Sequence, residues 1–232
     1  MVLRDNTCWL LVLGAVLACG AGCNSNDSPA IGYVLGEPRF LAKIHRVVFI
    51  ELESEQSYPS VAKDMTLALA QAIQARRLFH IDVIYRDDPI CEMLSLDGRS
   101  GFSMDQLRAM RKSLGCDAVL IGSMRDFRPH PYTQMGLYVR LLDVKNGRLV
   151  WGVDHVWNTT DVGTEKRIRK FFDKQMRSGY EPMDWQLAMI SPKVFGKFVA
   201  YEAAGTLPEG PVYQGYPAAQ SPRGWADFRK IP

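Results

Sequence analysis

Ser60 and Lys63 are the first residues in the chain whose types and spacing could support catalysis. Ser-x-x-Lys is the arrangement of serine acyl-enzymes, in which a lysine one helical turn away activates the serine hydroxyl. The Ser-Asp-Asn and Lys-Thr-Gly elements that accompany it in those enzymes do not occur in this sequence. Two fixed positions also arise by coincidence on the exposed side of an amphipathic helix. A serine hydrolase that uses Ser60 and Lys63 is therefore a distant alternative to a protein without an active site.

The other polar residues form no pattern that would hold a metal or a cofactor. None of the histidines has metal-ligand spacing to another histidine or to a cysteine, and no Gly-rich phosphate loop is present. Glu51, Glu53 and Glu55 alternate after an apolar run, so their side chains can share one side of a strand end. Ligands often bind at such ends of parallel strands, but a solvated strand end gives the same pattern. We expect no metal, no cofactor and no enzymatic activity.

The N-terminus has the pattern of a bacterial lipoprotein signal. The apolar run Cys8–Ala18 is too short to cross a bilayer and has the length of a signal-peptide core. Small and apolar residues then precede Cys19, which resembles a lipobox; in that class the signal is removed before the cysteine, which is diacylated on sulfur and acylated on its amine. The sequence predicts lipidation at Cys19, with Cys23 as a second candidate and an ordinary secretory signal as the alternative.

Four segments follow from composition and periodicity. We expect a signal peptide over residues 1–18, a lipidated tether over 19–43, a single α/β domain over 44–205 and a flexible Pro/Gly-rich tail over 206–232. Residues 24–43 extend at most ~70 Å, so the domain would stay near its membrane. The composition, 47% hydrophobic and 23% charged, is that of a globular protein, and the net charge of +3 is too small to indicate a nucleic-acid partner.

The stretch Leu114–Trp157 is the part around which the domain is expected to form. Its apolar segment Asp117–Ser123 is typical of a strand that is buried on both faces. Two alternating runs follow, Gly136–Val144 and Arg148–Trp157. The turn between them contains Asn-Gly, the strongest short-range signal of a hairpin.

The residues before this stretch predict a parallel arrangement. In order they read as strand, helix, strand and helix, over Arg46–Leu52, Pro59–Arg77, Ile81–Tyr85 and Ser103–Leu114. Two right-handed crossovers then give an α/β fold: a three-layer-like mixed β-sheet with a parallel core, an antiparallel hairpin at one edge and flanking helices. Because Cys91 follows one strand and Cys116 precedes the next, the two should lie at opposite ends of the sheet, and we expect no disulfide between them.

A basic amphipathic helix is expected over Thr164–Arg177, and a last helix opens at Ser191-Pro192. The basic face of the first consists of Lys166, Arg167, Arg169, Lys170, Lys174 and Arg177. Such a face can contact anionic lipid headgroups or an acidic partner, although most charged helix faces are only solvated.

Three stretches together resemble one family. They are RVVFIELE at 46–53, LGCDAVLIGSM at 114–124 and LLDVKNGRLVWG at 141–152. They are similar to the periplasmic domain shared by curli-assembly lipoproteins, the lipoprotein activators of penicillin-binding proteins and the N-terminal domain of the Tol-system propeller protein. The Leu-Gly-x-Asp-Ala-x-x-x-Gly stretch and the hairpin with Asp143, Gly147 and Trp151 carry the resemblance, which covers roughly residues 45–157. It implies a lipid-anchored mixed α/β domain that works by protein contact and has no catalytic residues common to the family.

The chain departs from the curli-type secretion pore. That pore inserts hairpins into the membrane, and each of their strands needs ~9–11 residues. Here the connection between two predicted strands, residues 125–134, is too short for such a hairpin and includes two prolines. We expect a protein-binding accessory or assembly factor of a cell-envelope machine, anchored by lipid to the outer membrane on its periplasmic side. A subunit of an oligomeric secretion or appendage complex is the alternative. The expected partners are an envelope protein, the membrane through its anchor and further copies of the chain, but no nucleic acid. Exposed apolar area beside the hairpin would favour partner binding or oligomerisation.

Overall fold

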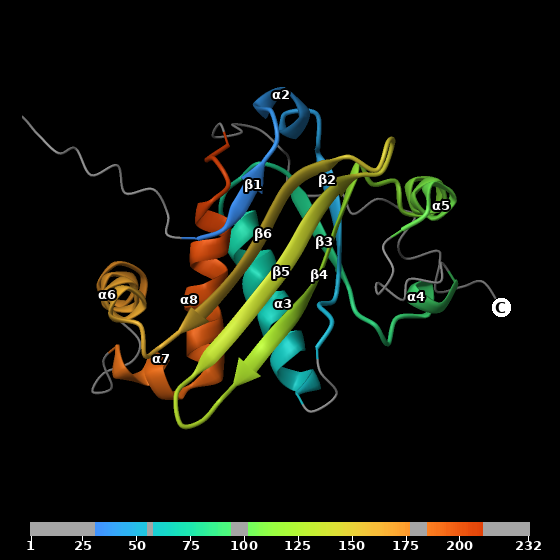
Figure 1. Ribbon diagram of the computed structural model, residues 1–232. Helices are drawn as coiled ribbons and strands as arrows, with labels where there is room; N and C mark the ends of the chain where they lie inside the picture. The colour runs from blue at the N-terminus through green and yellow to red at the C-terminus, as the bar shows by residue number, and fades with distance from the viewer. Residues whose placement is uncertain (1–30, 55–57, 94–101, 177–184, 211–232) are drawn as a thin grey trace, which may run out of the picture. The chain divides into compact units, whose positions relative to one another are not determined.

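The fold is built on one mixed sheet, seen face-on in Figure 1. The computed structural model describes residues 31–54, 58–93, 102–176 and 185–210. The strands, in chain order, are β1 (Tyr33–Leu35), β2 (Arg46–Ile50), β3 (His80–Ile84), β4 (Ala118–Arg128), β5 (Gln134–Asp143) and β6 (Leu149–Asn158). The helical segments are α2 (Pro38–Leu41), α3 (Pro59–Gln74), α4 (Pro89–Met93), α5 (Met104–Leu114), α6 (Val162–Phe171), the π-helical turn η2 (Phe172–Met176), α7 (Gln186–Ile190) and α8 (Pro192–Gly205).

The strand order confirms the predicted α/β architecture. Across the sheet the order is β1-β6-β5-β4-β2-β3. β2 pairs in parallel with β3 on one side and with β4 on the other, and every pair from β4 through β5 and β6 to β1 is antiparallel. The parallel core and the hairpin at its edge are therefore both as expected, since crossover helices return the chain in parallel and a tight turn returns it antiparallel.

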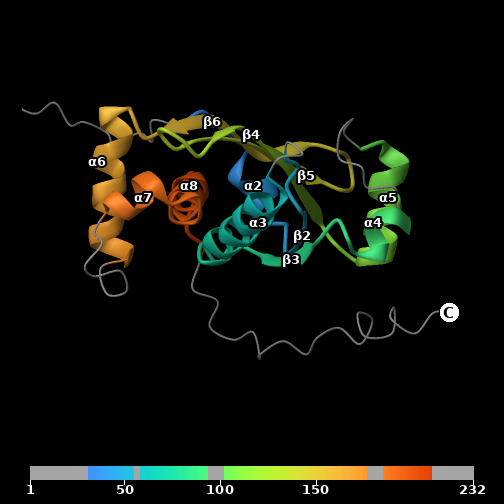
Figure 2. The same ribbon diagram turned by 90° about the horizontal axis from the view of Figure 1, so that it is seen from below.

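Helices cover the two faces of the sheet unequally (Figure 2). One face packs against α3 and α8 in a large apolar core that includes Phe49, Leu120 and Trp151. The other face packs against α4 and α5 in a smaller core that includes Val48 and Val119. Because alternate residues of β2 and β4 enter different cores, these strands are buried on both sides, which explains their unbroken apolar sequences.

The ends of α5 follow the local signals of the sequence. Ser103 and Gln106 form a reciprocal capping box, with Gln106 N donating to Ser103 Oγ and Ser103 N donating to Gln106 Oε1. Gly115 ends the helix at φ 62°, in the left-handed region that glycine adopts without strain. Cys116 follows directly and, like Cys91, is a buried free thiol, as predicted; burial raises the pKa of Cys116 to about 11.

The domain begins earlier than the predicted boundary at residue 44. Residues 33–35 form β1, which pairs with β6 through Tyr33 and Val153, and residues 38–41 form α2. The Gly- and Pro-punctuated composition of residues 24–43 conceals these elements, because a three-residue strand has no periodicity of its own. Only the stretch before Ile31 remains for a tether, and the predicted signal peptide, Cys19 and Cys23 all lie outside the described residues.

The domain also ends later than predicted. Thr206 and Leu207, assigned to the tail over 206–232, are buried, and the amide of Gly210 donates to Arg76 O at 2.8 Å. Thr206 is held by a hydrogen bond from Trp151, a long-range contact that no local pattern indicates. The rest of the predicted tail, residues 211–232, lies outside the described residues.

β4 is longer than its apolar run suggests. It continues through Arg128, so residues 125–128 belong to the sheet and not to the connection that the sequence predicts from 125 to 134. The pairing with β5 shifts between Arg125 and Arg128, where Asp126 has φ 51°. A bulge of this kind interrupts alternation and so hides a strand from pattern reading.

No helix within the described part of the chain is long and apolar enough to cross a membrane.

Candidate binding surfaces

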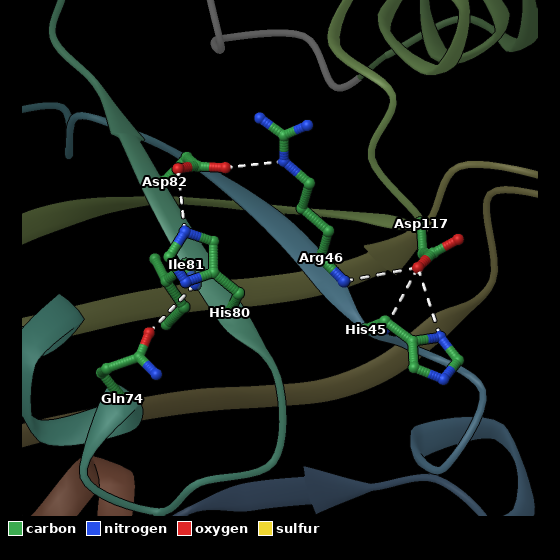
Figure 3. Close-up of polar contacts among 7 residues, drawn as sticks. All are labelled: His45, Arg46, Gln74, His80, Ile81, Asp82 and Asp117. Carbon is green, nitrogen blue, oxygen red and sulfur yellow. Dashed lines mark hydrogen bonds and ion pairs between the residues drawn. The ribbon is translucent and has the colours of Figure 1, made fainter. Parts of the chain in front are cut away.

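Asp117, the aspartate of the Leu-Gly-x-Asp-Ala stretch, joins two parallel strands at their amino ends (Figure 3). Its Oδ2 accepts hydrogen bonds from the backbone amides of His45, at 3.0 Å, and Arg46, at 3.3 Å. Its own amide donates to Arg46 O at 2.9 Å. The carboxylate thus satisfies the first amides of β2, which explains why an acid stands at the entry to β4.

The polar groups beside Asp117 are paired among themselves (Figure 3). Arg46 Nε donates to Asp82 Oδ2 at 2.7 Å, and His80 Nε2 lies 3.1 Å from Asp82 Oδ1. Gln74 Oε1 accepts from the amide of Ile81. These contacts connect β2, β3 and the end of α3, so this cluster stabilises the sheet edge.

The hairpin motif is also structural. Asp143 Oδ1 accepts from the amide of Lys145 at 2.8 Å, and Gly147 turns the chain at φ 69°. Trp151 is fully buried, and its Nε1 donates to Thr206 Oγ1 at 2.8 Å. Gly122, the last residue of the other motif, is required by close strand approach, because a Cβ there would lie 2.1 Å from Tyr138 O. The residues that carry the family resemblance therefore build the fold.

Ser60 and Lys63 are exposed near the start of α3 and are not joined to each other by a hydrogen bond in the described structure. Lys63 Nζ lies 3.6 Å from Asp87 Oδ2 and 4.7 Å from the ring centroid of Tyr85. The lysine is thus directed toward the end of β3. A general base must lie within hydrogen-bond reach of the proton it removes, and this arrangement does not provide that contact.

Arg86 contacts both acidic residues that follow β2 within the described part of the chain. Glu51 Oε2 accepts from the Arg86 amide at 2.9 Å, and Arg86 Nη2 lies 3.2 Å from Glu53 Oε1. Glu55, the third alternating acid, lies outside the described residues. Sequence reasoning missed Arg86, although it follows the strand that neighbours β2. Among described residues, no group of three or more His, Cys, Asp and Glu side chains could hold a metal ion.

A shallow cavity of about 200 Å³ lies between α3 and α8. Met65, Met135 and Gly196 are among the residues that line it. Lys193 Nζ lies 3.9 Å from Asp64 Oδ2, and both residues belong to the lining. The volume is below the usual ~300–1,000 Å³ of small-molecule sites, so the cavity gives no basis for a ligand.

Two arginines of the predicted basic helix face contact other parts of the protein. Arg167 Nε lies 3.0 Å from both Oε1 and Oε2 of Glu202, which also accepts from Trp157 Nε1 at 2.9 Å. The Arg169 guanidinium lies 3.9 Å from the Trp185 ring centroid. These contacts attach α6 to its neighbours, so neither arginine is a free surface charge.

The lysines of the same face remain exposed. Lys166 and Lys170 lie on α6 and Lys174 on η2, and the side chains of all three are exposed. Asp161 caps the start of the helix, because its carboxylate accepts from the amide of Thr164 at 2.8 Å, and the π-helical turn η2 follows its end. Arg177, the last member of the predicted basic face, lies outside the described residues.

His155 lies half-buried on β6, with its ring 4.7 Å from that of Trp157 in an edge-on arrangement. Burial and then the nearby Arg167 lower the pKa of His155 below its ordinary value of 6.5. Asp154, its neighbour in sequence, points to the opposite side of the strand. The two side chains therefore do not form the catalytic dyad that their adjacency could suggest.

We expect the free energy of unfolding to fall as pH drops below about 6.5, because the unfolded chain then binds a proton that His155 in the folded state still resists. Urea unfolding from neutral to mildly acidic pH measures this. His155→Gln should flatten the pH dependence in that window. An unchanged slope in His155→Gln would show that other groups cause the acid loss.

One face of the sheet is not covered by any described element beside the hairpin. It lies opposite Leu137, Val139 and Trp151, which point into the large core. Helices α4 and α5 cover this face only near the parallel strands. We call the uncovered part the open face; its residues are Val34, Arg125, Tyr138, Arg140, Leu149, Asp154 and Val156.

The open face combines exposed apolar side chains with ordered charges. Val34 is 58% exposed, and Val156 is 44% exposed. The guanidinium of Arg125 lies 4.4 Å from the ring centroid of Tyr138, and its Nη2 is 3.1 Å from Asp154 Oδ1. The guanidinium of Arg140 lies 5.2 Å from the same ring. Cation–π contact and the ion pair hold these long side chains over the sheet, so less entropy is lost if a partner binds them.

The sequence does not identify the residues that form the open face. Val34 falls in the predicted tether, and Arg125 falls in a predicted connection. Both reach the open face only through strand pairing, since Val34 lies opposite Gly152 and Arg125 opposite Gly136. A signal was available in Tyr138 and Arg140, which alternate with core residues on β5.

No protein-family model and no curated protein matches this chain. Among solved structures it is similar to a PelC dodecamer from Paraburkholderia phytofirmans, at 16% identity over 55% of this chain and 79% of that chain, with a TM-score of 0.40. It is also similar to lipoprotein GNA1162 from Neisseria meningitidis, at 14% identity over 58% of this chain and 97% of that chain, with a TM-score of 0.38. These similarities are too distant to assign a family.

Proposed function

We propose that this protein is a lipid-anchored component of the bacterial cell envelope that acts by binding another protein through the open face. The observation that carries the proposal is the composition of that face. A sheet face turned to water normally alternates polar residues with the core residues behind it. Here Val34, Leu149 and Val156 are exposed instead.

The arrangement of charge on the open face supports a protein as the ligand. Arg125, Arg140 and Asp154 stand among the apolar residues, and Tyr138 lies between the two arginines. Protein interfaces combine an apolar centre with a polar rim and are enriched in tyrosine and arginine. As an accessory or assembly factor, the protein would hold its partner at the membrane. Binding is preferred to hydrolysis because Lys63 is engaged away from Ser60.

Val34→Asp combined with Val156→Asp should reduce partner recovery at least ~10-fold, because two desolvated contacts become buried carboxylates. The measurement is quantitative affinity purification of the lipidated protein from its own membranes. Leu67→Asp provides a matched control, since Leu67 is 45% exposed but lies on α3. Equal recovery by wild type and the double variant, both folded, would exclude the open face as the docking site.

We expect the mature protein to begin at Cys19 and to carry acyl chains there, because Cys19 directly follows the lipobox-like residues. Three acyl chains would anchor the protein firmly, whereas one chain binds only marginally. Mass spectrometry of the N-terminal peptide measures this, and Cys19→Ser should abolish the modification while Cys23→Ser leaves it. An unmodified terminus beyond residue 19 would leave only Cys23 or a protein without an anchor.

A subunit of an oligomeric complex is the second candidate, and the edge strand β1 favours it. Gly32 O and Gly36 N bond to β6, so by antiparallel alternation the backbone groups of Tyr33 and Leu35 point away from the sheet. Their side chains are 42% and 39% exposed. Leu35→Pro removes the outward amide without touching the bonds to β6. If β1 pairs between copies, light scattering should show a smaller assembly for this variant.

A further inference from the structure

We propose that Lys166, Lys170 and Lys174 form a contact site for anionic phospholipid headgroups. We call these three residues the lysine stripe. They recur every four residues along α6 and η2, and all are exposed. Lys166 and Lys170 lie on the side of α6 opposite the fully buried Ile168, so both side chains lie on the outer side of the helix.

The helix that carries the lysine stripe is firmly held. Phe171 is buried, with its ring 5.8 Å from Phe198 and 5.0 Å from Tyr201 on α8. The ion pair of Arg167 with Glu202 fixes the middle of α6 to the same helix. A surface held in this way presents its charges without the cost of ordering a loop.

The lysine stripe also lies on the side of the domain where the chain arrives from its anchor. Gly32 O accepts from Asp154 N at 3.0 Å, which places the N-terminal entry beside β6. β6 ends at Asn158, and α6 begins at Val162. Figures 1 and 2 show α6 beyond α8 and well away from α4 and α5. The N-terminal entry and the lysine stripe therefore belong to the same edge of the sheet.

The length of the tether favours a membrane over an acidic protein as the occupant. Gly20–Ile31 can extend no more than ~40 Å from Cys19. A lipidated chain thus keeps the N-terminal entry of the domain, and with it this edge of the sheet, within reach of the headgroups. Each lysine near an anionic surface contributes about 1 kcal/mol, or roughly 5-fold in affinity. Among the described residues, Asp173 is an exposed acid between Lys170 and Lys174, and Glu165 pairs with Arg169.

The inference takes the lipid anchor from the proposed function, but its test does not need one. The mature chain, from residue 19 onward with Cys19→Ala and Cys23→Ala, is mixed with phosphatidylcholine vesicles, with and without phosphatidylglycerol, and the bound fraction is measured by sedimentation. We expect a preference for the anionic vesicles that Lys166→Glu, Lys170→Glu and Lys174→Glu together reduce on the order of 100-fold. Salt near ~1 M should remove the preference, because the Debye length falls to ~3 Å.

The matched control reverses three exposed charges on α5, at Arg108, Arg111 and Lys112. It changes the net charge equally and should keep the preference. Lys→Gln replacements at the stripe repeat the test with less helix perturbation. Equal losses from both charge reversals would show a net-charge effect and overturn the proposal. A wild type without preference for phosphatidylglycerol would also overturn it and leave the stripe to an acidic protein. Loss of acylation at Cys19, by contrast, would weaken the proposed anchor and leave this assay unaffected.

Discussion

Trp151→Ala is expected to lower the free energy of unfolding by about 3–5 kcal/mol, the range for replacing large buried aromatic residues with alanine. Trp151 has no exposed surface and belongs to the large core between the sheet and its helices. Its indole also donates to Thr206, which would lose a buried partner. Denaturant unfolding of wild type and variant measures the difference.

Two further variants separate the contributions at Trp151. Thr206→Val keeps the shape of the acceptor but removes its oxygen, and should cost about 1–3 kcal/mol because the indole N–H is left unpaired. Trp151→Phe retains most of the apolar contact and should lie between the two. An unchanged melting temperature in Trp151→Ala would mean that the hairpin does not pack as described.

Glu202→Ala is expected to cost about 2–4 kcal/mol, because it leaves Arg167 and the Trp157 indole without their common acceptor. The side chain of Arg167 is 27% exposed and can regain water, which lowers the expected loss of stability. The loss should concentrate at α6, so hydrogen exchange of α6 amides should accelerate more than that of β4.

Glu165→Ala is the control for Glu202→Ala. Glu165 pairs with Arg169 across one helical turn at the surface, and such pairs contribute at most about 0.5 kcal/mol. If the two alanine variants lose equal stability, Glu202 does not connect α6 to α8. A double variant with Arg167→Ala would then show no coupling between the two positions.

Local chemistry explains which parts of the fold the sequence predicts. Asn146-Gly147 specifies a turn because glycine adopts positive φ, and Ser103 with Gln106 specifies a helix start because each satisfies an amide of the other. The doubly buried strands follow from unbroken apolar runs. Each of these signals lies within a few residues of the structure that it determines.

The missed elements depend on contacts between distant residues. β1 has three residues and exists through its pairing with β6, more than a hundred positions later in the chain. The contact of Arg167 with Glu202 requires α6 and α8 to pack together, so residues that look alike in a helical projection differ in role. The open face likewise depends on the register that sets Arg125 and Tyr138 on one side of the sheet.

Site-specific photocrosslinking of the lipidated protein in its own membranes tests the open face most directly. A photoreactive side chain is placed at Val156, at Val34 or, as the control, at Leu67, all of which are exposed. If the open face binds a protein, positions 156 and 34 should yield an adduct with the same protein, and position 67 should not. Adducts at position 67 without any at positions 34 and 156 would contradict the account.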